Sequence, residues 1–148
     1  MKKEHFRIKA VHASEPHFLH ITFGDDALMT IDLSRIIDRT PLLAPLKDFA
    51  LFSRAGVGEW GLSVVWVPDE LELAGDNLRA EGVEQSGGVS HERIWEWMHR
   101  NRLNLDTAAK ALGISRRMLA YYRSGQRAIP RHIWLACLGW EVEERKAA

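Results

Sequence analysis

The chain has 148 residues, and its 20 Lys and Arg balance its 20 Asp and Glu, so the formal net charge is zero. With 46% hydrophobic and 27% charged residues, the composition is that of a globular protein of one ordinary or two small domains, which excludes a disordered or fibrous chain. Apolar runs such as Leu62 to Val67 are far shorter than the roughly 18–20 residues of a membrane span. Because the first residues lack the pattern of a signal peptide and the single cysteine, Cys137, cannot form an internal disulfide, we expect a cytoplasmic protein.

The first 80 residues carry the signals of strands and tight turns. Residues 6–11 alternate between apolar and polar, and residues 18–23 and 27–33 flank the turn Gly24-Asp25-Asp26, which predicts a hairpin. A compact apolar strand is predicted over residues 62–67. Short helices are predicted over residues 35–38 and 47–54. Residues 1–80 are therefore expected to form a small α+β domain with an antiparallel sheet.

Residues 81–89 contain three glycines among polar neighbours and show no periodicity. This composition is typical of a linker. We therefore expect three segments, with a domain over 1–80, a linker over 81–89 and a second domain over 90–148.

After residue 90 the hydrophobic period becomes that of helices. Ser90 is a good N-cap for a first helix, in which Ile94, Trp95 and Met98 form an apolar stripe. Trp97 is only two residues from Trp95, so it is expected to face away from this stripe.

Three further helices follow, each with a recognisable boundary. Asn104 caps the second helix, which has apolar residues at i, i+3, i+4 and i+7 and ends at Gly113. Ser115 caps the third helix, which stops at Gly125, and Pro130 suits the first turn of the fourth. The unit from 104 to 125 therefore predicts a capped helix, a three-residue turn and a second capped helix.

The balanced charge is unevenly distributed along the chain. Residues 1–98 carry a net charge of −6, residues 99–134 carry +7 and residues 135–148 carry −1. The cations of the middle segment are Arg100, Arg102, Lys110, Arg116, Arg117, Arg123, Arg127 and Arg131. Such a block favours a nucleic-acid contact, and the alternative is an ordinary solvated helical surface.

The helical wheel of the third helix separates a polar face from an apolar one. With a rotation of 100° per residue, the polar residues lie on an arc of about 140° and the apolar residues lie opposite. The polar face holds Arg116, Arg117, Ala120, Tyr121 and Ser124, and the opposite face holds Met118, Leu119 and Tyr122. Because an arginine fork can bond two acceptors on guanine, Arg116, Arg117 and Tyr121 are the candidates for reading bases.

The remaining polar groups of this segment are candidates for phosphate contacts, which determine affinity and register. The assigned residues are Arg100, Arg102, Asn104, Arg123, Ser124, Arg127 and Arg131. The free backbone amides at the capped helix starts, at Asn104 and Ser115, are also suited to phosphate.

The pattern Ala109-x-x-Leu112-Gly113-Ile114-Ser115 is followed by Leu119, Tyr122 and Ser124-Gly125. On this pattern residues 91–140 resemble the all-α helix-turn-helix domain of the lambda-repressor/Cro-like (xenobiotic-response-element type) superfamily. The family's groove-contacting positions match Ser115, Arg116, Arg117, Ala120 and Tyr121 here. Leu105 replaces the family's usual Gln, and its fifth helix is missing or reduced to residues 140–142.

A second resemblance covers residues 1–80. It depends on short matches spread along the segment: Phe23-Gly24-Asp25, Asp32-Leu33, Pro45-Leu46-Lys47-Asp48, Phe52, Trp60-Gly61, Val65-Trp66 and Leu71-x-Leu73. These resemble a small bacterial family of unknown function, whose members occur alone or fused to such a helix-turn-helix. Some members look like the antitoxin components of toxin–antitoxin pairs.

Other constellations of reactive residues favour structural roles. His12, His17 and His20 lack the cysteines and spacing of a zinc site, and Cys137 lies among apolar residues as a core thiol would. The acids Asp69, Glu70 and Glu72 have no accompanying base or phosphate loop. We therefore expect no enzyme activity, no metal and no cofactor.

Together the residues and the resemblances predict a bacterial, sequence-specific transcriptional regulator. It would insert residues 115–124 into the major groove of double-stranded DNA and act as a homodimer, because one such unit covers only a half-site. The alternative is an antitoxin-like interaction module whose N-terminal domain binds a toxin-like protein partner.

Overall fold

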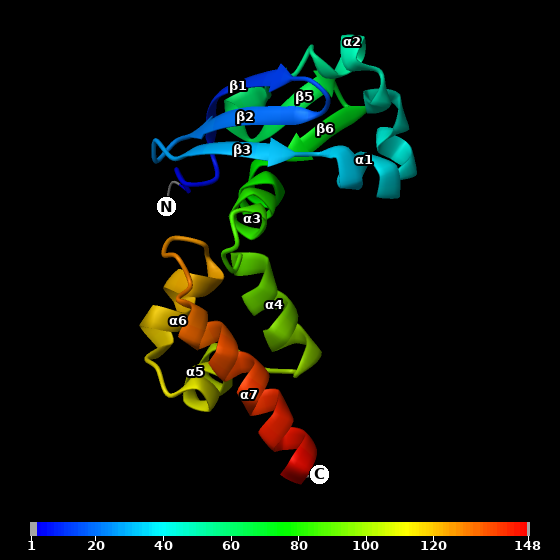
Figure 1. Ribbon diagram of the computed structural model, residues 1–148. Coiled ribbons are helices and arrows are strands. Elements are labelled where there is room, and N and C mark those ends of the chain that lie inside the picture. The colour runs from blue at the N-terminus through cyan, green and yellow to red at the C-terminus, as the bar shows by residue number, and fades with distance from the viewer. Residues whose placement is uncertain (1–2, 148) are drawn as a thin grey trace. The chain divides into compact units, whose positions relative to one another are not determined.

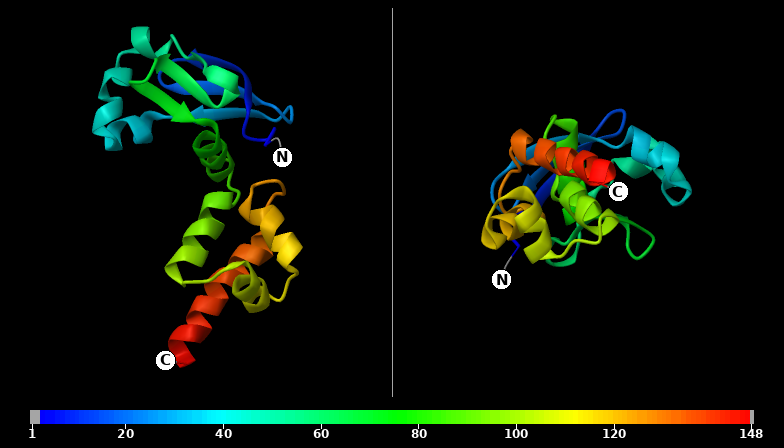
Figure 2. Two further views of the ribbon diagram at one scale, coloured as in Figure 1. Left: turned by 180° about the vertical axis from the view of Figure 1, so that it is seen from behind. Right: turned by 90° about the horizontal axis from the view of Figure 1, so that it is seen from below.

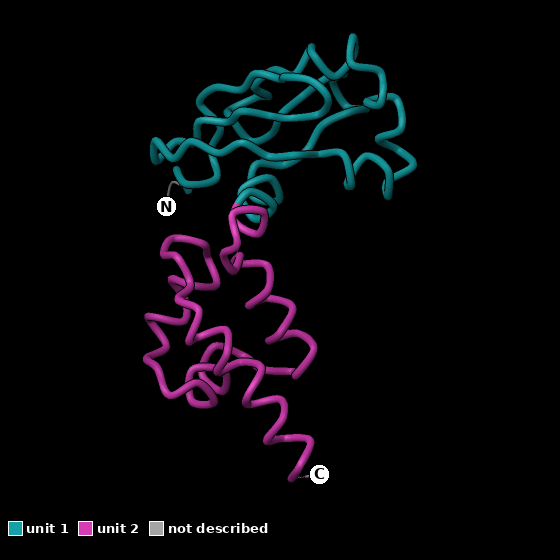
Figure 3. Tube along the Cα trace, in the orientation of Figure 1, with its two compact units in different colours: residues 1–82 teal, residues 83–148 magenta. Residues whose placement is uncertain are grey.

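The computed structural model describes residues 3–147 and divides the chain into two compact units, residues 1–82 and 83–148 (Figure 3). Unit 1 combines strands with short helices and unit 2 is entirely helical, so the α+β fold class is confirmed. Within the described residues, no helix has both the length and the apolar character needed to cross a membrane.

Unit 1 contains two three-stranded antiparallel sheets rather than one (Figure 1). The first sheet has the order β1 (Ile8–Ser14), β2 (Phe18–Phe23) and β3 (Leu28–Asp32), and β2 begins and ends where the sequence predicts. The second has the order β4 (Gly56–Val57), β5 (Ser63–Val67) and β6 (Leu71–Ala74). The two-residue strand β4 lacked any alternation that could have revealed it, since a period of two needs several residues to be visible.

The helices that begin in unit 1 are mostly short, and the last of them continues past residue 82. They are α1 (Ser34–Arg39), the 3-10 helix η1 (Pro41–Lys47), α2 (Phe49–Phe52), the 3-10 turn η2 (Glu59–Gly61) and α3 (Gly75–Gln85). The helix predicted over 47–54 is reduced to α2, because Asp48 is extended and its carboxylate accepts a hydrogen bond from the Ala50 amide at 3.1 Å as an N-cap.

Both sheets contribute their inner faces to one core. Leu19, Ile21 and Phe23 of β2 alternate into this core and are almost fully buried, as the period of two predicts. From the second sheet, Trp66 stacks on Phe52 with ring centroids 5.7 Å apart. Its indole nitrogen donates to the Phe52 carbonyl at 2.8 Å, so the buried polar atom of this tryptophan is satisfied.

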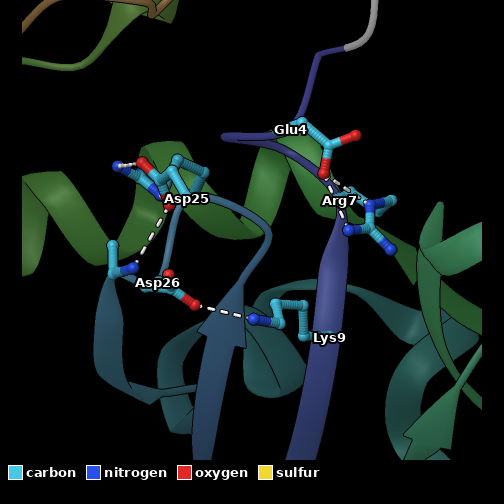
Figure 4. Close-up of polar contacts among 7 residues, drawn as sticks. Glu4, Arg7, Lys9, Asp25 and Asp26 are labelled. Carbon is cyan, nitrogen blue, oxygen red and sulfur yellow. Dashed lines mark hydrogen bonds and ion pairs between the residues drawn. The ribbon is translucent and has the colours of Figure 1, made fainter.

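The turn at residues 24–26 is held by ion pairs (Figure 4). Lys9 Nζ lies 2.7 Å from Asp26, and Arg7 pairs with Glu4 nearby. Arg79 of α3 donates to both carboxylate oxygens of Asp25 at 2.9 Å. Burial by itself would raise the pKa of Asp25, but the hydrogen bonds from Arg79 and the Ala27 amide outweigh it and hold the pKa below its ordinary value. These contacts attach α3 to the hairpin of the first sheet.

The linker expected over residues 81–89 is partly wrong, because α3 continues as a helix to Gln85. Gly82 is buried in this helix, and a Cβ at this position would lie 2.6 Å from Met29 Sδ and 3.3 Å from two side-chain carbons of Ile31. This glycine therefore permits close packing of the helix on β3 rather than chain flexibility. Only the following residues, 86–90, lack regular structure.

The helices that follow α3 lie in unit 2 (Figures 1 and 2). They are α4 (His91–Arg100), α5 (Leu105–Leu112), α6 (Arg116–Arg123) and α7 (Arg131–Ala147). Pro130 accepts the first helical bond of α7 from Ile133 at 3.0 Å, which agrees with the predicted start. The segment 140–142, expected as a vestige of a fifth helix, is instead a continuous part of α7.

The tryptophans of α4 are placed the other way round from the prediction. Trp97 is 0% exposed and donates its indole N–H to the Cys137 carbonyl at 3.0 Å, whereas Trp95 is 51% exposed. Residues 94, 97 and 98 are spaced i, i+3 and i+4 and so share one helix face, and Trp95 lies about 100° away from Ile94. The predicted stripe of Ile94, Trp95 and Met98 was therefore wrong at its middle member.

Candidate functional site

The two central helices of unit 2 are joined by a three-residue turn with a cap on each side. At the start of α5, Asn104 accepts from the Thr107 amide at 2.8 Å while Thr107 Oγ1 accepts from the Asn104 amide at 2.9 Å, a reciprocal capping box. Gly113 ends α5 with φ of 70°, a conformation that favours glycine. Ser115 starts α6 by accepting from the Met118 amide at 3.1 Å. The predicted caps at Asn104, Gly113 and Ser115 are confirmed.

Small side chains allow the two helices to approach closely. Ala108 and Ala109 of α5 are buried, and Leu119 of α6 is fully buried in the same core. The opposite face of α6 carries Arg116 and Arg117, both exposed. The helix is therefore fixed along its apolar side and offers its cationic side to solvent.

Two arginines contact Tyr121, one on this exposed side of α6 and one in the loop that follows the helix. The Arg117 Nε donates to the hydroxyl of Tyr121 at 3.0 Å, and its guanidinium carbon lies 5.6 Å from the centre of that ring. The Arg127 guanidinium carbon lies 4.5 Å from the same ring centre. These distances are within the range of cation–π attraction, so Tyr121 lies beside two positive charges.

The side chains of the other predicted base-reading residues make fewer contacts. Arg116 lies 3.4 Å from Asp106 of α5, with both side chains largely exposed. A pair of this kind contributes little to stability and can be exchanged for another anion at small cost. Ala120 is partly buried, and the Ser115 hydroxyl already serves as the cap of α6.

Arg123 and Ser124 lie at the end of α6. The Arg123 guanidinium carbon lies 4.4 Å from the ring centre of Trp95, so this exposed tryptophan makes a cation–π contact. Ser124 Oγ donates to the Tyr121 carbonyl at 3.2 Å. Sequence reasoning missed Trp95 as a surface residue, and the wheel position of Trp97 beside Ile94 and Met98 was the signal that could have found it.

Arg100 is distinguished from the other candidates by a strong intramolecular partner. Its guanidinium donates two hydrogen bonds of 2.9 Å to Glu141 of α7, and Asn101 donates to the same carboxylate at 3.1 Å. The bonds from Arg100 hold the pKa of Glu141 below its ordinary value, and those same bonds raise the pKa of Arg100. Arg100 therefore links α4 to α7, which is a structural role that the sequence did not reveal.

The remaining phosphate candidates are exposed, and they lie in a loop or at the start of a helix. Arg102 lies in the loop after α4 with φ of 54°, and Arg131 is the first residue of α7. The Asn104 side-chain oxygen already accepts from the Thr107 amide in the capping box.

Reactive groups elsewhere in the molecule have structural surroundings. Cys137 is fully buried, and burial raises the pKa of its thiol to about 12, so the thiolate that a nucleophile needs is strongly disfavoured. His12 and His20 stack with ring centroids 4.5 Å apart, and His20 also contacts Ser14 and Thr30. Among residues 3–147, no group of three or more His, Cys, Asp or Glu side chains is arranged to hold a metal ion.

The described part of unit 1 contains an open groove with a volume of about 710 Å³. Trp60 and Leu62 line it and are 78% and 66% exposed, and Trp60 has φ of 60°, a backbone region that bulky residues rarely adopt. Lys3, Glu4, Arg7 and Asp76 also line the groove, and exposed apolar side chains among polar ones are typical of an interaction surface.

The fold and the site define a class of two-unit α+β proteins in which a strand-rich unit precedes four helices with a cationic exposed face. A solved structure that this chain resembles is that of "Putative DNA Binding Protein NE0471" from Nitrosomonas europaea ATCC 19718. The two chains are 46% identical, the match covers 95% of this chain and 90% of that chain, and the TM-score is 0.86. Neither a family model nor a curated protein matches the sequence. The chain belongs to the same family as NE0471.

Proposed function

We propose that this protein binds double-stranded DNA through unit 2, with the exposed face of α6 in the major groove. The observation that carries the proposal is the pair of exposed arginines, Arg116 and Arg117, at the start of a capped second helix that crosses a first one. A helix-turn-helix places the N-terminal residues of its second helix against base edges in this way. The name of the relative NE0471 supports the same function.

Two sets of residues would divide the work of recognition. Arg116, Arg117 and Tyr121, with Ser115 and Ala120 beside them, would meet base edges, where an arginine fork can bond guanine O6 and N7. Arg123, Arg127, Arg131 and Arg102 would meet phosphates, together with the start of α5 and Ser124. Arg100 is the weakest member of the second set, because a DNA phosphate would have to compete with Glu141 for its guanidinium.

Net charge supports DNA binding by unit 2 rather than by unit 1. Unit 1 has nine Lys and Arg against thirteen Asp and Glu, a net charge of −4, while unit 2 has eleven against seven, a net charge of +4. An acidic surface is repelled by the phosphate backbone, so unit 2 would hold the DNA. The proposal extends to a lambda-repressor-like transcriptional regulator in the cytoplasm. This regulator would act as a homodimer, because one helix-turn-helix covers only a half-site.

A salt series tests whether unit 2 binds DNA. Fluorescence anisotropy with a labelled duplex should give an affinity that falls linearly in log–log form as salt rises, since binding releases counterions from the phosphates. Selection from a random duplex library would then identify the preferred sequence. Absence of binding at low salt would refute the proposal, and binding without any selected sequence would reduce it to a non-specific DNA-binding protein.

A second candidate function is an antitoxin-like module in which unit 1 binds a protein partner. The exposed Trp60 and Leu62 beside the groove of unit 1 favour it. Purification of the tagged chain from its native host should yield a stoichiometric protein partner, and Trp60→Ser should release this partner. If the partner stays bound to the Trp60→Ser protein, the groove is not its binding surface.

A further inference from the structure

The contacts around Tyr121 connect two residues that the proposed function assigns to different tasks. Arg117 lies one turn before Tyr121 on α6 and is a candidate for reading a base. Arg127 lies in the loop after α6 and is a candidate for a phosphate contact. Both guanidinium groups contact the same tyrosine side chain, at 5.6 and 4.5 Å from the ring centre.

The hydroxyl and the ring of Tyr121 make different contacts. The hydroxyl accepts a hydrogen bond of 3.0 Å from Arg117 Nε, which leaves the terminal nitrogens of this guanidinium available to another acceptor. A free arginine side chain loses rotamer entropy when it binds, and a hydrogen bond that restrains it beforehand reduces the entropy that binding must remove. The hydroxyl is therefore suited to orient Arg117.

The aromatic ring of Tyr121 contacts Arg127, which lies in the loop that follows α6. The Arg127 amide donates to the Tyr121 carbonyl at 3.4 Å, and its guanidinium also reaches Met118 Sδ at 3.9 Å. Ser124 Oγ donates to the same Tyr121 carbonyl at 3.2 Å. The loop is thus folded back on Tyr121, and the ring sets the position of the Arg127 charge relative to α6.

We propose that Tyr121 is a positioning residue that holds Arg117 for base readout through its hydroxyl and Arg127 for phosphate contact through its ring. This proposal rests on DNA binding by unit 2. This task replaces the direct base contact proposed above for Tyr121, because its hydroxyl and its ring act through two arginines. It follows that sequence preference and general affinity can be separated at this one residue.

Two substitutions separate these contributions. Tyr121→Phe removes only the hydroxyl, so it should lower the ratio of affinities for a selected duplex and a scrambled duplex about tenfold, the discrimination of one base contact, with affinity for the scrambled duplex unchanged. Tyr121→Leu removes the ring as well, so it should also weaken binding to the scrambled duplex. Tyr122→Phe is the matched control, because this neighbouring tyrosine belongs to the core, and it should change neither quantity.

A double-mutant cycle tests whether the hydroxyl acts through Arg117. Arg117→Lys keeps the charge but removes Nε, so the double variant with Tyr121→Phe should discriminate no worse than Arg117→Lys alone. If Tyr121→Phe lowers discrimination equally in both backgrounds, the hydroxyl meets the DNA itself and the proposal is overturned.

Nuclear magnetic resonance of the free protein gives a readout that needs no DNA. The Nε–H signal of Arg117 should exchange slowly with solvent in the wild type and quickly in Tyr121→Phe, with the amide spectrum of unit 2 otherwise retained. Equal exchange in both proteins would overturn the inference while leaving DNA binding intact. If the wild type binds no duplex at all, the proposed function and this inference both fail.

Discussion

The two units of this protein contain the same type of buried hydrogen bond but differ in the net charge of their residues. Each has a buried tryptophan whose indole donates to a backbone carbonyl, Trp66 to Phe52 at 2.8 Å in unit 1 and Trp97 to Cys137 at 3.0 Å in unit 2. Outside these cores, unit 1 carries −4 and unit 2 carries +4. Core chemistry therefore explains why each unit folds, while surface charge distinguishes their proposed tasks.

The charges are also used differently within each unit. In unit 1, cations such as Lys9 and Arg79 pair with the acids of the hairpin turn. In unit 2, Arg100 and Arg116 also pair with acids. Its other contacts differ in kind, since Arg117 and Arg127 contact one aromatic ring and Arg123 contacts another. A guanidinium on an aromatic face keeps its charge unneutralised, so the cationic surface of unit 2 remains available to an anionic partner.

Replacing the buried tryptophan of each unit tests the two cores separately. Trp97→Ala should lower the free energy of unfolding of unit 2 by about 3–5 kcal/mol, because it leaves a cavity and removes the partner of the Cys137 carbonyl. DNA binding should be lost with it, whereas Trp66→Ala should destabilise unit 1 and leave DNA affinity unchanged where unit 1 remains folded. Denaturant unfolding followed by circular dichroism measures the stability of each variant.

The exposed Trp95 supplies the control. Trp95→Ala removes a tryptophan from the same helix and should change stability by less than about 1 kcal/mol, since it loses only a surface contact with Arg123. A large loss of stability in Trp95→Ala and a small one in Trp97→Ala would reverse the assignment of the two faces of α4.

A smaller effect concerns glycines in the helices of the two units. Gly82→Val should destabilise unit 1 by about 1–3 kcal/mol, because its side chain would meet Met29 and Ile31 across the contact between α3 and β3. Gly139→Ala should stabilise unit 2 by about 0.5–1 kcal/mol, because a Cβ at this position in α7 has no neighbour within 4 Å. Thermal unfolding measures both, and a neutral Gly82→Val would mean that residues 81–85 act as the flexible linker after all.

The ion pair of Arg100 with Glu141 should contribute about 1 kcal/mol at neutral pH. The pKa of Glu141 is lowered in the folded state, so its contribution is complete above the ordinary value of 4.5 and is lost as pH falls through the lower folded value. Glu141→Gln should therefore be less stable than the wild type at pH 7, and the two should converge in acid. Urea unfolding at both pH values checks this, and a difference that persists at pH 2 would contradict the ion pair as its cause.

The smallest effect tests the charge contrast between the units. Neutralising three exposed acids of unit 1, with Asp69→Asn, Glu70→Gln and Glu72→Gln, should raise the affinity for a scrambled duplex by about two- to threefold at low salt. The gain should shrink as salt rises, because exposed charges are screened. Lys47→Gln is the opposite control and should lower affinity slightly. If the triple variant binds no differently, the acids of unit 1 do not influence DNA binding.

Elements with a strong local signal were predictable from the sequence. The alternation of residues 18–23 gave β2 within its true bounds, and the caps Asn104 and Ser115 gave the starts of α5 and α6. In these places the side chain that produces the pattern also makes the stabilising contact, so local sequence and local structure agree.

Features decided by tertiary contacts were not predictable in the same way. Three glycines made residues 81–89 look flexible, but Gly82 is required by a contact with a strand about fifty residues earlier. The same holds for the pair of Arg100 and Glu141, which are 41 residues apart. For the site, the sequence predicted the exposed face of α6, but the contacts that Tyr121 makes with Arg127 depend on how the loop after α6 folds back.

In the proposed complex, unit 2 reads DNA bases with Arg117 and holds the phosphates with Arg127. The most direct test measures the affinities of Arg117→Ala and Arg127→Ala for the selected and the scrambled duplex at one salt concentration. We expect Arg117→Ala to lose about 1–3 kcal/mol on the selected duplex and little on the scrambled one, and Arg127→Ala to weaken both alike. Equal losses on both duplexes in both variants would contradict the account.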